Sequence, residues 1–142
     1  MAIVGFNFTK LNIENKGVFK ANEKISSDLK ILDIVPEKTA VDESKDLVKF
    51  LFEFSVDYAG SGTGLLGGEV VYLDEPEKVT ELLSNWKAKK AVQAELLQQI
   101  LNTVLFRCNI KALTMAQDVN LPPHFQLPRI EKEPSIAGEK KE

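Results

Sequence analysis

The sequence predicts an α+β domain: a four-stranded antiparallel sheet followed by a short helical linker and one long helix packed on the sheet. Three observations support this class. In residues 47–58 every even position is apolar and most odd positions are polar, and further stretches before residue 74 show the same period of two. From residue 75 the apolar side chains recur at steps of three and four, the spacing of a helix.

The most regular strand pattern is Leu47 to Tyr58, LVKFLFEFSVDY. Its even positions are apolar and its odd positions are largely polar, so the pleat directs all the large side chains to one face. Three phenylalanines and a tyrosine on one strand face require a large apolar partner elsewhere in the chain.

Three further strands are expected. Residues 3–14 alternate with a change of parity near Thr9 and Lys10, which predicts a bulge. Residues 24–35 form a second strand closed by Pro36, with an exposed connection from 37 to 46. The glycine-rich stretch 60–68 begins as a hairpin loop and continues into the strand EVVYL. We expect the four strands to form an antiparallel meander.

Two helices are expected next. Glu75 and Pro76 begin a short helix with Val79, Leu82, Leu83 and Trp86 at helical spacing. A long helix follows over 92–118. Its expected apolar stripe is Leu97, Leu101, Val104, Cys108, Ala112 and Met115. Leu96, Ile100, Phe106, Ile110 and Leu113 widen the apolar surface beyond half the circumference, so the helix should be covered on two sides.

Prolines 122 and 123 end the long helix and introduce an apolar extended strap over 121–130. Residues 131–142 are charged and nearly free of large apolar groups, which is typical of a disordered tail. We therefore expect one domain over 1–130. A chain of 142 residues is long enough to bury a core and fold without a metal or a disulfide.

Composition narrows the function classes. A net charge of −3 disfavours nucleic-acid binding, which requires clustered basic side chains. The N-terminus lacks a basic region followed by a long apolar run, and no stretch approaches the roughly 20 apolar residues that span a bilayer, so we expect no membrane insertion. The single cysteine, Cys108, fits a reducing compartment and predicts a cytoplasmic protein.

Signals of catalysis are weak. Gly62, Gly64 and Gly67 match the GxGxxG spacing, but a strand follows them where a dinucleotide site needs a helix. His124 is the sole histidine and Cys108 lies on the apolar stripe of the helix. We expect no catalytic residues, no metal and no cofactor, although an enzyme site assembled from scattered polar residues stays open.

Two polar or aromatic features have alternative interpretations. Glu53, Asp57 and Glu69 are expected on one outer face of the sheet, either as a solvated surface or as a docking surface for a protein partner. Trp86 is expected to pack at the end of the sheet or to help hold a ligand.

The order of elements resembles the secretion chaperone SecB and its relatives, and three stretches carry the resemblance. FNFTKLNIE is similar to the first strand of that family, and residues 74–77, DEPE, to the acidic segment before its helical linker. The long helix runs into NLPPHFQLP, which is similar to the family's proline motif. The matching positions are Leu121, Pro122, Pro123, Leu127 and Pro128.

The resemblance implies an ATP-independent holdase chaperone that binds non-native polypeptides, acts in protein export with a translocation motor, and forms a homotetramer as a dimer of dimers. It implies docking of a partner on the outer sheet face with Glu53, Asp57 and Glu69. The side chains expected to contact a client are Ile31, Leu32, Ile34, Trp86, Leu121, Phe125 and Leu127.

Two alternatives remain at this stage. One is a SecB-like chaperone dedicated to a single partner, such as an antitoxin. The other is a carrier of a small apolar ligand, held in a cavity between the sheet and the long helix.

Overall fold

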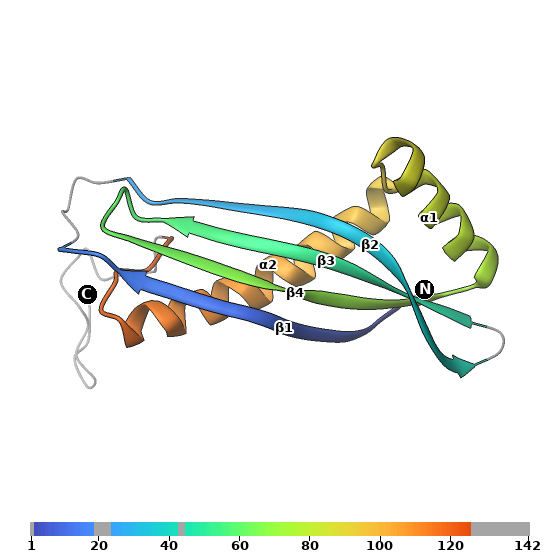
Figure 1. Cartoon of the computed structure of the whole chain (residues 1–142), viewed down its shortest axis with the longest axis horizontal. Coiled ribbons are helices and arrows are strands. Elements are labelled where there is room, and N and C mark those ends of the chain that lie inside the picture. Colours follow the sequence, from blue (N-terminus) through green and yellow to red (C-terminus); the bar gives the residue numbers. More distant parts are fainter. Residues whose placement is uncertain (1, 19–23, 43–44, 126–142) are drawn as a thin grey trace, which may run out of the picture.

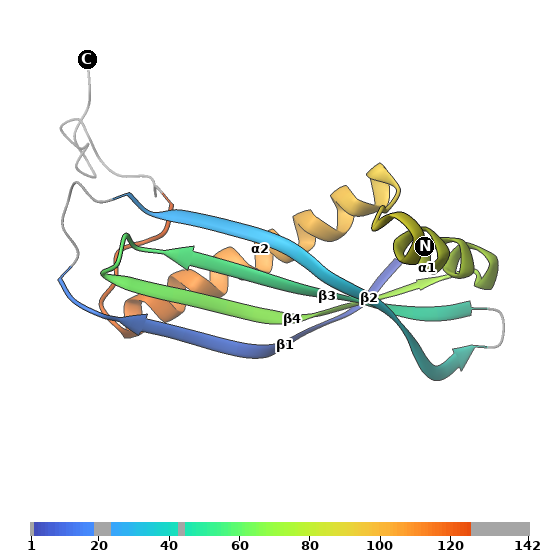
Figure 2. The same cartoon turned by 45° about the horizontal axis from the view of Figure 1, so that its top comes forward.

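The structure, a computed structural model, describes residues 2–18, 24–42 and 45–125 (Figure 1). One sheet and two helices form two layers, and both helices contribute to a single core on one face of the sheet (Figures 1 and 2). This confirms the predicted α+β class. The elements are β1 (Ala2–Asn15), β2 (Ser26–Asp42), β3 (Lys45–Asp57), β4 (Gly62–Asp74), α1 (Pro76–Lys89) and α2 (Ala94–Asp118).

The sheet is antiparallel throughout, but the predicted meander is wrong. The spatial order is β1-β4-β3-β2, so the first strand pairs with the last instead of with the second. This is the order of a Greek key read from its C-terminal strand. Residues 16–25 join the two edge strands, and a ten-residue link can span the roughly 14 Å between the edges of a four-stranded sheet. Strand periodicity does not specify neighbours, which is why the sequence did not reveal this order.

The phenylalanine face of β3 forms the centre of the core, as predicted. β3 lies between β2 and β4, and its even-numbered side chains from Val48 onward are almost fully buried. They meet the even-numbered side chains of β4 and the inner sides of both helices. The buried side chains of this face are Val48, Phe50, Phe52, Phe54, Val56 and Tyr58.

The edge strands differ from expectation in one respect. β1 has the predicted bulge, seen as a shift in register between Phe8 and Lys10. β2 does not end at Pro36: the strand continues to Asp42, Glu37 pairs with Leu47, and Asp42 pairs with Lys45. The expected exposed connection over 37–46 is therefore mostly strand. β2 is an edge strand, where proline is tolerated because its missing N–H can face away from the ladder.

The glycine-rich stretch is mainly strand, not loop. The turn occupies residues 58–61, closed by a hydrogen bond from Tyr58 N to Gly62 O of 3.0 Å, and β4 begins at Gly62. Gly68 lies where a Cβ would overlap the carbonyl oxygen of Asn7 on β1 and the ring of Phe52 on β3. Glycine at 68 therefore lets β1 and the Phe52 ring approach β4 closely.

Both helices form where expected. Pro76 occupies the first turn of α1, and Lys90 ends it in the left-handed conformation at φ 51°. α2 is one continuous helix, and its buried stripe shares only three positions with the predicted one. A step of four residues turns 40° beyond a full circle, so this line of contact winds slowly round the helix as α2 crosses the sheet obliquely (Figure 1). The stripe is Ile100, Val104, Cys108, Ala112 and Ala116.

Replacing Gly68 by alanine should destabilise the fold, by about 2 kcal/mol or more, because the new methyl group must displace backbone. Gly67→Ala is the matched control: its Cβ would meet Lys10 and Phe52 only at 3.6–3.7 Å, an ordinary contact. We expect Gly67→Ala to leave the free energy of unfolding nearly unchanged. Urea denaturation measures both, and equal stability of the two variants would contradict this account of β4.

Candidate functional site

The most conspicuous surface feature is a set of apolar side chains on α2 that remain exposed to solvent. Phe106 is 68% exposed, Ile110 is 52% exposed and Leu105 is 40% exposed. The sequence indicated this surplus, since the apolar width of the helix exceeds what one sheet can cover. It did not indicate which of these side chains point outward, and none of the three was among the expected client contacts.

Four expected client contacts lie around a bulge in β2. The register between β2 and β3 shifts between Ile31 and Asp33, and the extra residue, Leu32, is 50% exposed. Ile31 is half-buried and Ile34 is buried in the core. Within this group Leu32 therefore offers the most accessible apolar surface.

Trp86 is buried beside the same bulge. Its Nε1 donates to Asp33 Oδ1 at 2.9 Å, and the Lys90 ammonium lies 4.8 Å from the ring centroid. The hydrogen bonds from Trp86 and from Ile34 N lower the pKa of Asp33. Trp86 thus links α1 to β2 through a hydrogen bond. This agrees with the interpretation that its side chain packs against the sheet.

The remaining expected client contacts belong to the strap, described here over residues 121–125. Leu121 is buried, Phe125 is 41% exposed, and Leu127 lies outside the described residues. The Tyr58 hydroxyl donates to Pro122 O at 2.9 Å, so the strap lies at the hairpin end of the sheet. Asp33 pairs with Leu51, seven residues from Tyr58, which separates the strap from the Trp86 group by roughly 23 Å.

His124 is the point at which the strap meets β3 and α2. His124 contacts the rings of Phe54 and Phe125, with centroid distances of 5.8 and 4.8 Å, and its Nε2 lies 2.7 Å from Asn109 Oδ1. Leu105 lies one turn before Asn109 on the same side of α2, and Leu29 pairs with Phe54 across the sheet. We call Leu29, Leu105 and Phe125 the strap patch.

The outer face of the sheet carries the three expected docking carboxylates. The pairing of Glu53 with Gly67, Asp57 with Thr63 and Leu51 with Glu69 puts them on one face. Asp57 is exposed at the end of β3. Glu53, Asp57 and Glu69 therefore lie on the same outer face of the sheet, as predicted.

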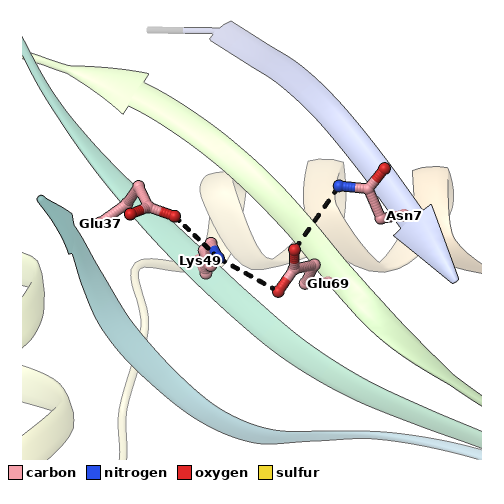
Figure 3. A network of polar contacts seen from close by, with 4 residues as sticks. All are labelled: Asn7, Glu37, Lys49 and Glu69. Atoms are coloured by element: carbon pink, nitrogen blue, oxygen red, sulfur yellow. Dashed lines mark hydrogen bonds and ion pairs between the residues drawn. The ribbon is translucent and has the colours of Figure 1, made fainter. Parts of the chain in front are cut away.

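Two lysines pair with carboxylates of this face, and Figure 3 shows one of them, Lys49, between Glu37 and Glu69. Lys49 lies 2.7 Å from Glu37 and 3.5 Å from Glu69, and Asn7 contacts Glu69 at 3.5 Å. The hydrogen bond to Glu37 and the charge of Glu69 raise the pKa of Lys49. Lys30 pairs with Glu53 at 3.7 Å. The surface is a mixed-charge ladder, less acidic than the carboxylates alone suggested.

A second polar group lines a cleft of about 870 Å³ between α1, α2 and the end of β4. The Tyr72 hydroxyl donates to Asp74 Oδ2 at 3.2 Å, and Glu75 N donates to Asp74 Oδ1 at 2.8 Å. Burial, with the Asp74 charge beside it, raises the pKa of Tyr72 to about 12. These contacts join β4 to the first turn of α1.

Within residues 2–18, 24–42 and 45–125, no group of three histidine, cysteine, aspartate or glutamate side chains could hold a metal ion. Neither helix in these ranges combines the length and the apolar character that crossing a membrane requires.

Trp86→Phe should weaken the attachment of α1, because it removes the donor that contributes most to the low pKa of Asp33. A lowered carboxyl pKa contributes stability above the usual value of 3.8 and loses it as the pH falls below that value. We expect the gap in urea midpoint between wild type and Trp86→Phe to be largest at pH 7 and to narrow below pH 4. A gap independent of pH would contradict the role of this hydrogen bond.

Comparisons with known proteins return little at the level of sequence. No protein-family model matches the chain, and no curated protein matches it. Among solved structures, the chain is similar to the SecB-like chaperone Rv1957 of Mycobacterium tuberculosis, solved in complex with a ChAD peptide from the Rv1956 HigA1 antitoxin. The identity is 13%, the match covers 94% of this chain and 92% of that chain, and the TM-score is 0.47. A likeness at this level supports no inference about function.

Proposed function

We propose that this protein is an ATP-independent holdase chaperone that binds non-native polypeptides and works as a homo-oligomer in the cytoplasm. The observation that carries the proposal is the exposed apolar surface of α2 and the strap, formed by Leu105, Phe106, Ile110 and Phe125. Exposed apolar area of this kind marks interaction surfaces in soluble proteins. The resemblance of residues 74–77 and 121–128 to the SecB family supports the same function.

The client contacts are proposed at the strap patch and at Leu32. Leu29 and Ile31 are half-buried and lie on the same side of β2, where they pair with Phe54 and Phe52. We propose that the client path runs along them, from the bulge at Leu32 toward Phe125 and Leu105. From residue 29 to residue 34 this path is roughly 17 Å long, enough for about five residues of an extended client. Binding would be passive, because burial of client side chains supplies the free energy.

A second copy of the chain is proposed to cover the outer side of α2. Positions 99, 103, 106, 110, 113 and 117 recur at steps of four and three, the spacing of a helix–helix seam. An antiparallel partner in one register brings Phe106 opposite Ile110 of the second copy and Gln99 opposite Gln117. Apolar pairs then fill the centre of the seam, and amides that can hydrogen-bond lie at its two ends. We expect a dimer by this seam and a tetramer through further contacts.

The identity of the client separates two forms of the proposal. A general chaperone for export would pass clients to a translocation motor, and a dedicated one would hold a single partner such as an antitoxin. Either motor or partner would dock on the outer sheet face near Glu53, Asp57 and Glu69. The mixed charges of that face favour a partner that also presents both signs of charge.

The alternative of a small-molecule carrier is less well supported. The sheet-facing side chains Ile100, Val104 and Cys108 are fully buried against the phenylalanine face, so close packing occupies the place expected for a helix-on-sheet cavity. A carrier would have to bind its ligand in the cleft between α1, α2 and the end of β4. A lipid that co-purifies with a monomeric protein would favour the carrier over the chaperone.

The holdase proposal predicts loss of client binding in the double variant Leu105→Ser, Phe125→Ser. Two half-exposed apolar side chains at about 1 kcal/mol each should weaken client affinity roughly tenfold or more. The assay is light scattering of a chemically denatured client, with stoichiometric protein and no nucleotide. If the wild-type protein remains folded and leaves aggregation unchanged, the function proposed here is wrong.

The matched control is Val4→Ser, Leu11→Ser. It removes two apolar side chains of comparable exposure from β1, away from the strap patch. We expect it to retain suppression of aggregation. Equal losses in both double variants would indicate non-specific adhesion by exposed apolar area instead of a defined client surface.

The seam predicts that Ile110→Glu lowers the solution mass measured by sedimentation, because a charge would face Phe106 of the second copy. Ser84→Glu adds the same charge to an exposed position on α1 and should leave the mass unchanged. A wild-type monomer would contradict the seam outright.

The antiparallel register has its own test in a Cys108→Ala background. Gln99→Cys and Gln117→Cys together should form inter-chain disulfides, since these positions meet across the seam. The two are roughly 27 Å apart along one helix and cannot join within a chain. Either cysteine alone should not cross-link. Efficient cross-linking of Gln99→Cys by itself would indicate a parallel seam.

A further inference from the structure

The chain folds back sharply after α2. Asn120 adopts a left-handed conformation at φ 61°, and Leu121 N donates to Ala116 O at 2.8 Å. Asn15 Nδ2 donates to Val119 O at 2.8 Å, and the Tyr58 hydroxyl holds Pro122. The strap is thereby directed across the hairpin end of the core, where the His124 ring packs against Phe54.

His124 occupies an apolar pocket as a neutral ring. It is 8% exposed, and its Nε2 lies 2.7 Å from Asn109 Oδ1. Because an amide oxygen can only accept, we assign the ring proton to Nε2, which leaves Nδ1 as an unprotonated acceptor. Nδ1 is buried and has no hydrogen-bond partner in the part of the chain that the structure describes. The imidazole ring also makes T-shaped contacts with the rings of Phe54 and Phe125.

We propose that His124 is an acid-sensitive latch that keeps the strap docked on β3 and α2 while the ring is neutral and releases it on protonation. A proton on Nδ1 would create a buried N–H donor without an acceptor among the described residues, and it would place a positive charge out of contact with water. Both are unfavourable in an apolar pocket. Moving the strap into solvent relieves both at once.

The charged groups on the packed elements do not offset this cost. On α2, Arg107 and Lys111 lie about 200° round the helix from Asn109, and Arg107 stacks 5.0 Å from the Phe6 ring on β1. Cys108 stays uncharged, because burial raises its pKa to about 12. The strap residues 121–125 carry no charged group besides a protonated His124. The nearest charges on β2 and β3 project from the opposite face of the sheet, and they are Asp28, Lys30, Glu53 and Asp57.

The direction of the pH effect follows from the burial of the ring. Burial lowers the pKa of His124 below its ordinary value of 6.5. The released strap therefore binds a proton more readily than the docked strap does. Docking is favoured fully above pH 6.5, and below that pH the ratio of released to docked strap rises by up to tenfold per pH unit until the docked ring itself titrates.

Release would uncover the inner surface of Phe54 and free Phe125 to move, which enlarges the apolar surface of the strap patch. The expected consequence is stronger capture of non-native chains at mildly acidic pH, and this consequence rests on the proposed chaperone function. The latch itself does not, because strap release is a property of the protein alone.

The latch is tested by amide hydrogen exchange of the full chain at pH 7.5 and pH 5.5, corrected for the intrinsic pH dependence of exchange. We expect protection of the Leu121 amide, which donates to Ala116 O, to fall several-fold to tenfold at pH 5.5, while protection of the β3 core stays unchanged. Unchanged protection at Leu121, or an equal loss across β3, would overturn the proposal.

Two variants isolate the histidine. His124→Phe keeps an aromatic ring without a titrating group and should give protection at Leu121 that does not depend on pH. Asn109→Asp places a carboxylate at Nε2, stabilises the protonated ring and should keep the strap docked at pH 5.5. A pH response in His124→Phe equal to wild type contradicts the latch, as does an undiminished response in Asn109→Asp.

Client capture is measured in parallel by the light-scattering assay with wild type and His124→Phe. Failure of wild type to suppress aggregation at pH 7.5 would count against the chaperone function and leave the exchange result intact. Suppression that improves at pH 5.5 in wild type and not in His124→Phe would connect the latch with client binding. Equal suppression at both pH values would disconnect them.

Discussion

The structure depends on the burial of the phenylalanine face of β3 in one core that it shares with β4, α1 and α2. Six alternate side chains of residues 48–58 are nearly excluded from water there. This core fixes which side of α2 faces the sheet. It also requires Gly68 on the neighbouring strand, because the Phe52 ring occupies the space that a side chain at 68 would need.

Burying one side of α2 leaves the other side as the functional question. The helix carries apolar side chains round more than half of its circumference, yet the sheet covers a stripe that narrows to alanine at positions 112 and 116. The small side chains of Ala112 and Ala116 face the sheet in the C-terminal half of the helix. Phe106 and Ile110 lie on the exposed side. The same geometry that completes the core therefore produces the surface for which we propose a second copy.

The sequence predicted the elements better than their arrangement. The period of two located four strands, and the break at residue 75 located the helices to within two residues. Pairing of β1 with β4 was missed because alternation reports which face is buried and not which strand is adjacent. The length of β2 was missed because Pro36 stops a central strand but not an edge strand. Of the expected client contacts, Leu32 and Phe125 are exposed, Ile31 is half-buried, Ile34, Trp86 and Leu121 are buried, and Leu127 lies outside the described residues.

By itself the sequence determined the fold class, the apolar face of β3 and the surplus on α2, because these follow from local periodicity along a continuous stretch. Only the tertiary structure decided where the surplus emerges, how lysines divide the outer carboxylates, and that His124 is enclosed with no partner for Nδ1 among the described residues. Each of these depends on residues far apart in the chain: Asn109, Phe54 and His124 meet because α2, β3 and the strap converge at one end of the sheet. Sequence periodicity cannot predict this convergence, because the convergence arises from the packing of whole elements.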